Sequence, residues 1–270
     1  MNNENIMKRA ELHFHTKFSK NHHSSIEVSK AIEKAKELNL SSIAFCDYKS
    51  VDAFTDITNI KNENKSDIKI IYGAELPFMT TSQTIKTKGY SLTLLAKNQD
   101  GITALQELAT TLTPDKKYSA CELLDLELLN RNKQNLLIGS TGDHGEIFFE
   151  TKWWWEFPKD YKKMAEFYDF FEIYPPRNQE DKKVIEMVLE LSRAFHVPIV
   201  ATSCALSLSA LDEEKRLEEM KIKFPYYKSE NHFLRSTDEV LKEFSFLGED
   251  IAYDIVIKNP TLIADRIETY

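Results

Sequence analysis

The sequence predicts an α/β domain in which crossover helices join parallel strands. Three observations indicate this class. Short apolar or β-branched segments recur along the chain, segments with helical spacing of apolar residues separate them, and side chains able to bind metal follow several of the strand-like segments. Alternation of this kind is typical of either an open doubly wound sheet or a closed barrel. The order of the segments leaves both architectures open.

The strand signal is strongest in a series of short segments. They are residues 10–14, 41–46, 68–72, 90–96, 136–139, 170–174 and 198–202. The first helix is expected to open at Ser25, because an apolar stripe at helical spacing follows it. Further helices are expected at residues 51–62, 100–112, 161–167 and 181–196, and throughout the tail from 237 to 267. Segment 79–88 is rich in Thr, Ser and Lys and is expected to be an exposed loop.

The composition is that of an ordinary globular protein, with 270 residues, 42% hydrophobic and 29% charged. We expect residues 1–270 to form a single domain, although this length would also accommodate two small ones. The formal net charge of −8 repels phosphate backbones. We therefore expect little direct DNA binding by this chain alone, and any work on nucleic acid would need a nucleic-acid-binding partner.

The chain carries no sequence signal for export or for a membrane. Its apolar runs are too short to cross a bilayer, and its first residues lack the basic and apolar regions of a signal peptide. Cys46, Cys121 and Cys204 are scattered and odd in number, which disfavours a disulfide framework. We therefore expect a cytoplasmic protein.

Side chains able to bind metal follow the strand-like segments, where the strand ends of a barrel would form one mouth. His13 and His15 are two apart on a strand, so both imidazoles point to one face and can reach one ion. Glu75 would add an oxygen ligand able to bridge two ions, and Cys204 a thiolate for zinc. Each also has an ordinary interpretation, as a water-facing polar residue, a surface carboxylate or a small core residue.

Three weaker candidates accompany these four. Asp47 ends the second strand-like segment, and His144 follows the segment at 136–139. His22 lies beside His23 in an apparent loop, where adjacent histidines are usually solvated. The ligand candidates are therefore His13, His15, Glu75, Cys204, His22, Asp47 and His144.

Several stretches together resemble the PHP domain of PolC-type bacterial DNA polymerase III alpha subunits. Residues 11–19 (ELHFHTKFS), 43–48 (IAFCDY) and 70–75 (IIYGAE) resemble the first three motifs of that family. The similarity returns at 142–146 (GDHGE), 232–239 (HFLRSTDE) and 243–249 (EFSFLGE). The last two stretches favour the PolC form over other PHP phosphatases.

The resemblance implies a distorted (β/α)7 barrel, similar to a TIM barrel, with a helical C-terminal tail and up to three metal ions at its mouth. In PolC proteins an exonuclease domain interrupts the PHP domain, and the matching place here is the short loop 79–88. The resemblance therefore implies no exonuclease at this position. It also implies a role in DNA replication, with polymerase or replisome subunits as partners.

Four ligand positions depart from the family pattern. The Asp after the first motif aligns with His22, the His of the second motif with Tyr48, and a Cys or His with Gly142. The last motif aligns with Cys204 and Leu206. Since Gly and Leu have no donor side chain, the resemblance implies a partly lost metal site that holds one zinc or manganese ion, or none.

Two functions remain open at this stage. The first is a structural or interaction module in DNA replication, which the altered ligand set favours. The second is an active metal-dependent phosphoesterase, in which ions would activate water and neutralise phosphoryl charge. A TIM-like barrel with unrelated chemistry is a remote third, because a fold alone does not determine function. Whether the chain is an enzyme is therefore left undecided by the sequence.

Overall fold

The structure is a computed structural model that describes residues 8–20, 23–63, 67–79, 89–114, 122–154, 161–224 and 232–269. Its main sheet contains five strands in the order β1-β2-β3-β4-β7, and two smaller sheets pair β8 with β9 and β5 with β6. The strands are β1 (Ala10–Phe14), β2 (Ser42–Tyr48), β3 (Lys69–Phe78), β4 (Tyr90–Ala96), β5 (Thr113–Pro114), β6 (Glu122–Leu123), β7 (Leu136–Gly139), β8 (Phe171–Ile173) and β9 (Ile199–Ala201).

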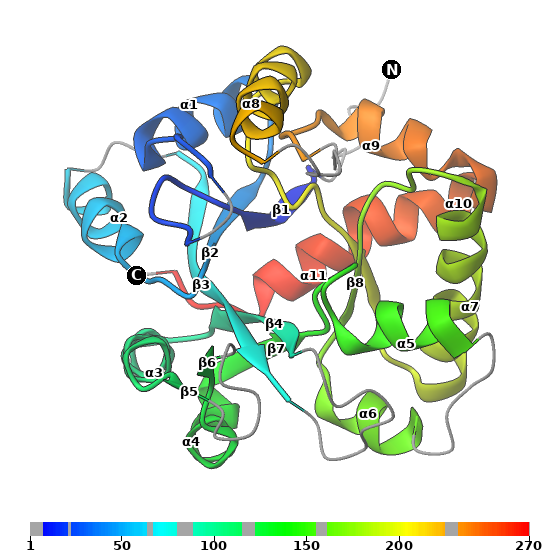
Figure 1. The fold of residues 1–270 in the computed structure, drawn as a ribbon, viewed down its shortest axis with the longest axis horizontal. Coiled ribbons are helices and arrows are strands. Elements are labelled where there is room, and N and C mark those ends of the chain that lie inside the picture. Colours follow the sequence, from blue (N-terminus) through cyan, green and yellow to red (C-terminus); the bar gives the residue numbers. More distant parts are fainter. Residues whose placement is uncertain are drawn as a thin grey trace, which may run out of the picture.

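The main sheet is curled, and each of its edges meets the β8–β9 pair through a single β-bridge. Gly139 at the end of β7 bridges Phe170, and Phe14 at the end of β1 bridges Ala205. Figure 1 shows the strands around a common centre, with most of the helices outside them. The predicted α/β class is confirmed, with a sheet that forms a half-barrel. A closed seven-stranded barrel stays a prediction.

The predicted parallel pairing is confirmed for β1, β2 and β3 and is wrong for β4. β1, β2 and β3 run parallel, whereas β4 pairs antiparallel with β3 and with β7. Phe78 on β3 is paired with Tyr90 on β4, and the connection between them is too short for the crossover of about a dozen or more residues that a parallel pair needs. Of the loop expected at 79–88, only Met79 lies within the described residues.

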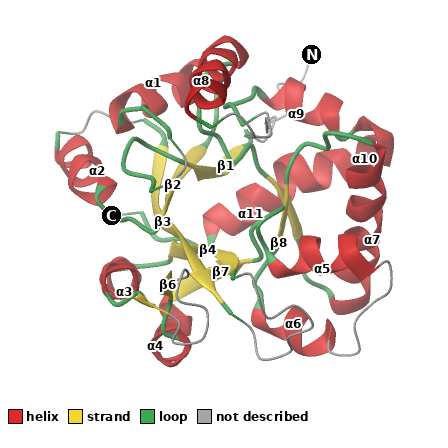
Figure 2. Ribbon diagram, in the orientation of Figure 1, coloured by secondary structure: helices red, strands yellow, loops and turns green. Residues whose placement is uncertain are grey.

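The helices cover the outer side of the strands and are red in Figure 2. They are α1 (Val28–Glu37), α2 (Ala53–Asn62), α3 (Gln99–Thr110), α4 (Leu126–Asn132), η1 (Lys133–Asn135), α5 (Glu146–Trp154), α6 (Tyr161–Phe167), α7 (Gln179–Phe195), α8 (Ala210–Lys223), α9 (Thr237–Glu243), η2 (Ser245–Leu247), α10 (Glu249–Tyr253), η3 (Asp254–Lys258) and α11 (Asn259–Asp265). The described tail is largely helical, as expected. Within the described part of the chain, no helix is both long and apolar enough to cross a bilayer.

Because side chains alternate along each strand, the strands bury two separate apolar clusters. The outer cluster lies between strands and helices and includes Phe14, Ile43 and Phe45. The inner cluster joins residues of the main sheet and the β8–β9 segment to α11: Ala10, Leu12, Ala44, Cys46, Ile71, Leu95, Leu137, Phe170, Val200, Ile263, Ala264 and Ile267. In Figure 1, α11 crosses behind the centre of the strands. One end of the enclosed space is therefore filled with apolar side chains.

A β-bulge in β1 turns the two histidines toward the inside. Glu11 pairs with Ile43 and Phe14 pairs with Phe45, so three steps along β1 match two steps along β2. Phe14 lies in the outer cluster, where its ring contacts the Phe45 ring edge-on. Its neighbours His13 and His15 therefore point to the inner side, next to the apolar inner cluster. Bulges commonly redirect a side chain in this way beside functional sites.

Candidate metal centre

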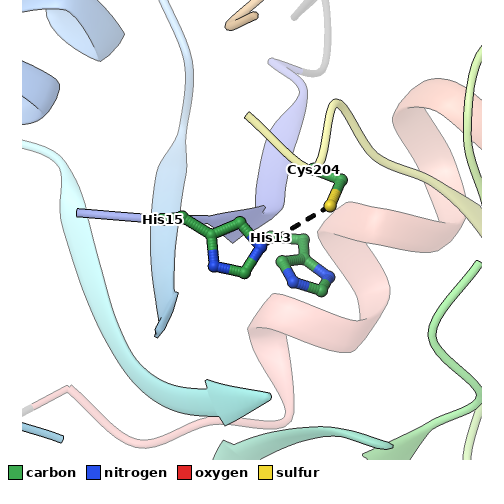
Figure 3. A group of neighbouring side chains, drawn as sticks. All are labelled: His13, His15 and Cys204. Atoms are coloured by element: carbon green, nitrogen blue, oxygen red, sulfur yellow. Dashed lines mark hydrogen bonds between the residues drawn. The ribbon is translucent and has the colours of Figure 1, made fainter. Parts of the chain in front are cut away.

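Four of the seven predicted ligand residues meet at one point. His13 and His15 come from the end of β1, Glu75 from β3, and Cys204 from the segment that follows β9. The ligand atoms of His13, His15 and Cys204 lie within 4.8 Å of one another, and Figure 3 shows the three side chains directed toward a common centre. The structure thus brings together residues that are up to 191 positions apart in the sequence, as His13 and Cys204 are.

Three distances between the donor atoms match those expected around a single ion. Nε2 of His13 is 3.4 Å and Nε2 of His15 is 3.5 Å from Oε2 of Glu75. Sγ of Cys204 is 3.6 Å from Nε2 of His15. Donor atoms held ~2.0–2.3 Å from one tetrahedral ion lie about 3.3–3.7 Å from each other. Nε2 of His13 is also buried and has no hydrogen-bond partner among the described residues, as a nitrogen aimed at an ion would be. The residues therefore fit a metal ion.

Glu172 on β8 holds the His13 ring in place. Nδ1 of His13 lies 2.7 Å from Oε1 of Glu172, while Thr93 and Thr202 donate hydrogen bonds to the same carboxylate, each of 2.6 Å. The Glu172 carboxylate accepts the proton on Nδ1, so the lone pair of Nε2 faces the centre. His15 has a similar arrangement, with Nδ1 3.1 Å from the hydroxyl of Ser19.

The centre has a negative electrostatic environment. Burial alone would lower the pKa of His13, but the carboxylates of Glu172 and Glu75 outweigh burial and raise this pKa to about 10. In the absence of metal, His13 therefore carries a proton that neutralises part of the charge between the two carboxylates. A divalent cation at the same place would supply that positive charge instead.

Two residues around the centre have backbone conformations that are unusual for their type. Cys204 has φ 43° and Thr141 has φ 46°, both in the left-handed region that favours glycine. The Thr141 hydroxyl is 2.9 Å from that of Thr93, which contacts Glu172. Strained residues of this kind persist where surrounding structure holds them, and they gather at functional sites.

Two of the other predicted ligands, Asp47 and His144, are not part of this group. The Asp47 carboxylate accepts hydrogen bonds from the backbone N–H and the hydroxyl of Thr16, and burial raises its pKa to about 6 in spite of these bonds. It orders the turn after β1. His144 lies in the turn before α5, where its backbone carbonyl accepts a hydrogen bond from Ser91. His22 lies outside the described residues.

Tyr174 occupies the space that a side chain at position 142 would need. A Cβ atom added to Gly142 would lie 2.8 Å from Cδ2, Cε2 and Cζ of the Tyr174 ring. The same ring contacts the His13 ring edge-on, with 6.1 Å between centroids. The Tyr174 ring therefore fills the space beside Gly142 and also packs against His13, one of the candidate ligands.

The centre is shielded from solvent. His13 and His15 are 0% exposed, Glu75 1% and Cys204 2%. A pocket of about 310 Å³ lies beside the centre, and its lining includes Tyr174, Arg177, His232 and Arg235. Tyr174 is the lining residue that contacts His13. A larger pocket of about 1110 Å³ is lined by residues of α2 and α3 and is remote from these side chains.

The candidate site residues predicted from the sequence did not include Glu172 or Tyr174. Glu172 was visible as a metal-capable side chain on a strand-like segment, because it is a single carboxylate within the apolar strand β8. Tyr174 gave no signal, since an aromatic residue after a buried strand is ordinary. Tyr174 packs where Gly142 has no side chain, and the two residues become neighbours only in the folded chain.

Comparison with known proteins identifies relatives. A family model described as PHP domain matches residues 11–187. DNA polymerase III PolC-type from Staphylococcus haemolyticus (strain JCSC1435) is 32% identical over 195 residues, and the protein of the same name from Staphylococcus aureus is 33% identical over 195 residues. Each match covers 66% of this chain and 13% of the relative. The matched region is therefore a small part of these polymerases.

Solved structures give a weaker likeness. PsfC from Pseudomonas syringae PB-5123 aligns with a TM-score of 0.44 at 13% identity, over 74% of this chain and 76% of that one. The lesion-specific endonuclease PfuEndoQ from Pyrococcus furiosus aligns with a TM-score of 0.44 at 16% identity, over 74% and 48% of the two chains. TM-scores this low add nothing to the sequence match.

Proposed function

Since this chain belongs to the PHP domain family, we propose that it is a PolC-type PHP domain that serves as a structural or interaction module in DNA replication and holds one divalent ion. The observation that carries this proposal is the combination of ligand spacing and burial. Three donor-atom distances among His13, His15, Glu75 and Cys204 support a site for one ion, yet these side chains are at most 2% exposed. A phosphoester in solution could not reach them.

The donors favour zinc. Nε2 of His13, Nε2 of His15 and Sγ of Cys204 would hold the ion, with the Glu75 carboxylate as the oxygen donor. Imidazole and thiolate suit zinc, whereas manganese prefers carboxylates and water. A bound zinc ion would neutralise the carboxylates and cross-link β1, β3 and the segment after β9. Glu172 contributes by fixing the orientation of His13.

The wider context of the proposal comes from the relatives and from charge. Similarity to PolC-type polymerases supports a place beside polymerase or replisome subunits in the cytoplasm. Because the net charge of −8 repels phosphate backbones, we expect those partners and not this chain to contact the DNA. In this proposal residues 1–270 form one PHP domain, whose half-barrel sheet and β8–β9 pair together make up the distorted seven-stranded barrel.

One observation favours a second candidate, an active metal-dependent phosphoesterase. The pocket beside Tyr174 is lined by Arg177, His232 and Arg235, which are groups that suit a phosphate. Its lining also includes the carboxylates of Asp143 and Glu243, and Asp143 pairs with Arg177. However, multi-metal hydrolysis needs ions close together, and Gly142 and Leu206 offer no donor side chain for further ions.

Metal content and hydrolysis separate the two candidates. The experiment measures metal by elemental analysis in protein purified without chelator, and hydrolysis of a generic phosphomonoester with added manganese or zinc, for the parent and His13→Ala. We expect at most one zinc per chain in the parent, less in His13→Ala, and background hydrolysis in both. Two or three ions with turnover that His13→Ala abolishes would favour the phosphoesterase. A parent that binds no ion even with added zinc would contradict the one-ion centre.

A further inference from the structure

The hydroxyl of Tyr174 is an exception among the buried tyrosines. Tyr174 is 5% exposed, and its hydroxyl is buried with no hydrogen-bond partner among the described residues. By contrast, Tyr168 is also 5% exposed and donates its hydroxyl to Glu146, and Tyr90 donates to Glu150. A buried polar group without a hydrogen-bond partner destabilises the folded state. The Tyr174 hydroxyl therefore lacks an interaction that its position would require.

The groups around Tyr174 place this hydroxyl beside the candidate metal centre. Its ring contacts His13 on one side and His232 on the other, with centroid distances of 6.1 Å and 5.8 Å. The Tyr174 ring therefore lies directly against one of the proposed ligands, and its buried hydroxyl has no hydrogen-bond partner among the described residues.

The absence of a side chain at Gly142 leaves room for the Tyr174 ring. The ring carbon that carries the hydroxyl, Cζ, lies 2.8 Å from the position of a Cβ at residue 142, which is closer than real Cβ contacts. Any residue other than glycine at 142 would have to displace the Tyr174 ring. The ring can lie against His13 because residue 142 has no side chain.

We propose that the phenol oxygen of Tyr174 is a further ligand of the ion held by His13, His15, Glu75 and Cys204. This inference rests on the one-ion centre of the proposed function and extends it. If an ion were bound there, the phenol would release its proton to solvent and its oxygen would serve as a donor to the ion. Catalytic zinc sites keep one position for water, whereas structural sites are closed by protein ligands. With Tyr174 as a fifth protein donor, the centre would leave no position for a bound water that could attack a phosphoester.

Cobalt substitution tests this assignment, because cobalt(II) reports its ligands in the visible spectrum. The full chain is freed of metal and titrated with cobalt, and the near-ultraviolet difference spectrum is recorded for the band of ionised tyrosine. Zinc affinity is measured by competition with a chelator. The variant is Tyr174→Phe, which keeps the ring and removes only the hydroxyl. The matched control is Tyr168→Phe, an equally buried tyrosine whose hydroxyl contacts Glu146.

We expect the parent and Tyr168→Phe to show the ionised-tyrosine band on binding one cobalt. Tyr174→Phe should lack the band, have an altered visible spectrum and bind zinc at least about tenfold more weakly. A parent that binds cobalt without the ionised-tyrosine band would overturn the assignment. This measurement uses only the parent protein, so it does not depend on whether a variant folds. Equal bands and affinities in the parent and Tyr174→Phe would also overturn it. A parent that binds no cobalt would instead contradict the one-ion centre itself.

Discussion

Nδ1 of His13 lies 2.7 Å from Oε1 of Glu172, and this contact selects which ring nitrogen faces the centre. Glu172 is itself held by hydroxyls of Thr93 and Thr202. The orientation of His13 is therefore determined by three elements other than its own strand: β4, β8 and the residue that follows β9. A carboxylate behind a metal-binding histidine typically raises its basicity and restricts its ring.

Glu172→Gln should weaken zinc binding although Glu172 is not a proposed ligand. We expect a loss of about 10–100-fold in affinity, because the amide is a poorer acceptor for Nδ1–H and no longer fixes the ring. Isothermal titration calorimetry on metal-free protein measures this. The control is Glu150→Gln, a buried glutamate whose partner is Tyr90, and its zinc affinity should match that of the parent. An unchanged affinity in Glu172→Gln would show that His13 is oriented by other contacts or does not bind the ion.

Cys204→Ser should reduce zinc affinity by at least about tenfold, since a hydroxyl is a much weaker zinc donor than a thiolate. Cys46→Ala is the matched control. Cys46 is also buried, but it belongs to the apolar inner cluster. We expect it to lower stability without changing the zinc affinity. If both cysteine variants bind zinc as tightly as the parent, Cys204 is a core residue and not a ligand.

The sequence indicated His13, His15 and Glu75 because their signals are local. A two-residue spacing on a strand and a carboxylate that follows a β-branched run are visible without knowledge of the fold, although Glu75 lies inside β3 and not after it. The bulge in β1 and the antiparallel direction of β4 were not predictable in this way, because both depend on how one strand pairs with another. The same holds for Asp47. Its position at a strand end suggested a ligand, but in the folded chain the backbone N–H and the hydroxyl of Thr16 donate hydrogen bonds to its carboxylate.

The stability of the metal-free protein should fall as the pH rises above neutrality. The pKa of His13 is raised from 6.5 to about 10 in the folded state. A raised histidine pKa stabilises the fold fully below the unfolded value of 6.5, and this contribution is lost as the pH rises toward 10. Between pH 6.5 and pH 9 the loss would be up to about 3 kcal/mol.

Urea unfolding with a chelator present, at several pH values, measures this dependence. His13→Gln should flatten it, because glutamine does not titrate. The control is His196→Asn, at the left-handed C-terminal end of α7, where Asn is tolerated. This variant should keep the slope of the parent. An equal slope in the parent and His13→Gln would show that the two carboxylates do not hold a proton on His13.

Gly142→Ala should destabilise the protein by about 1–3 kcal/mol, because the new methyl group would overlap the ring of Tyr174. Among the described glycines, only Gly248 has a positive φ, so the backbone at 142 accepts alanine and the cost comes from the contact. A double-mutant cycle with Tyr174→Leu isolates that contact. In the Tyr174→Leu background, Gly142→Ala should cost at least about 1 kcal/mol less in the free energy of unfolding. The same cost in both backgrounds would mean that Tyr174 does not occupy the space beside residue 142, and the proposed position of its hydroxyl would fail with it.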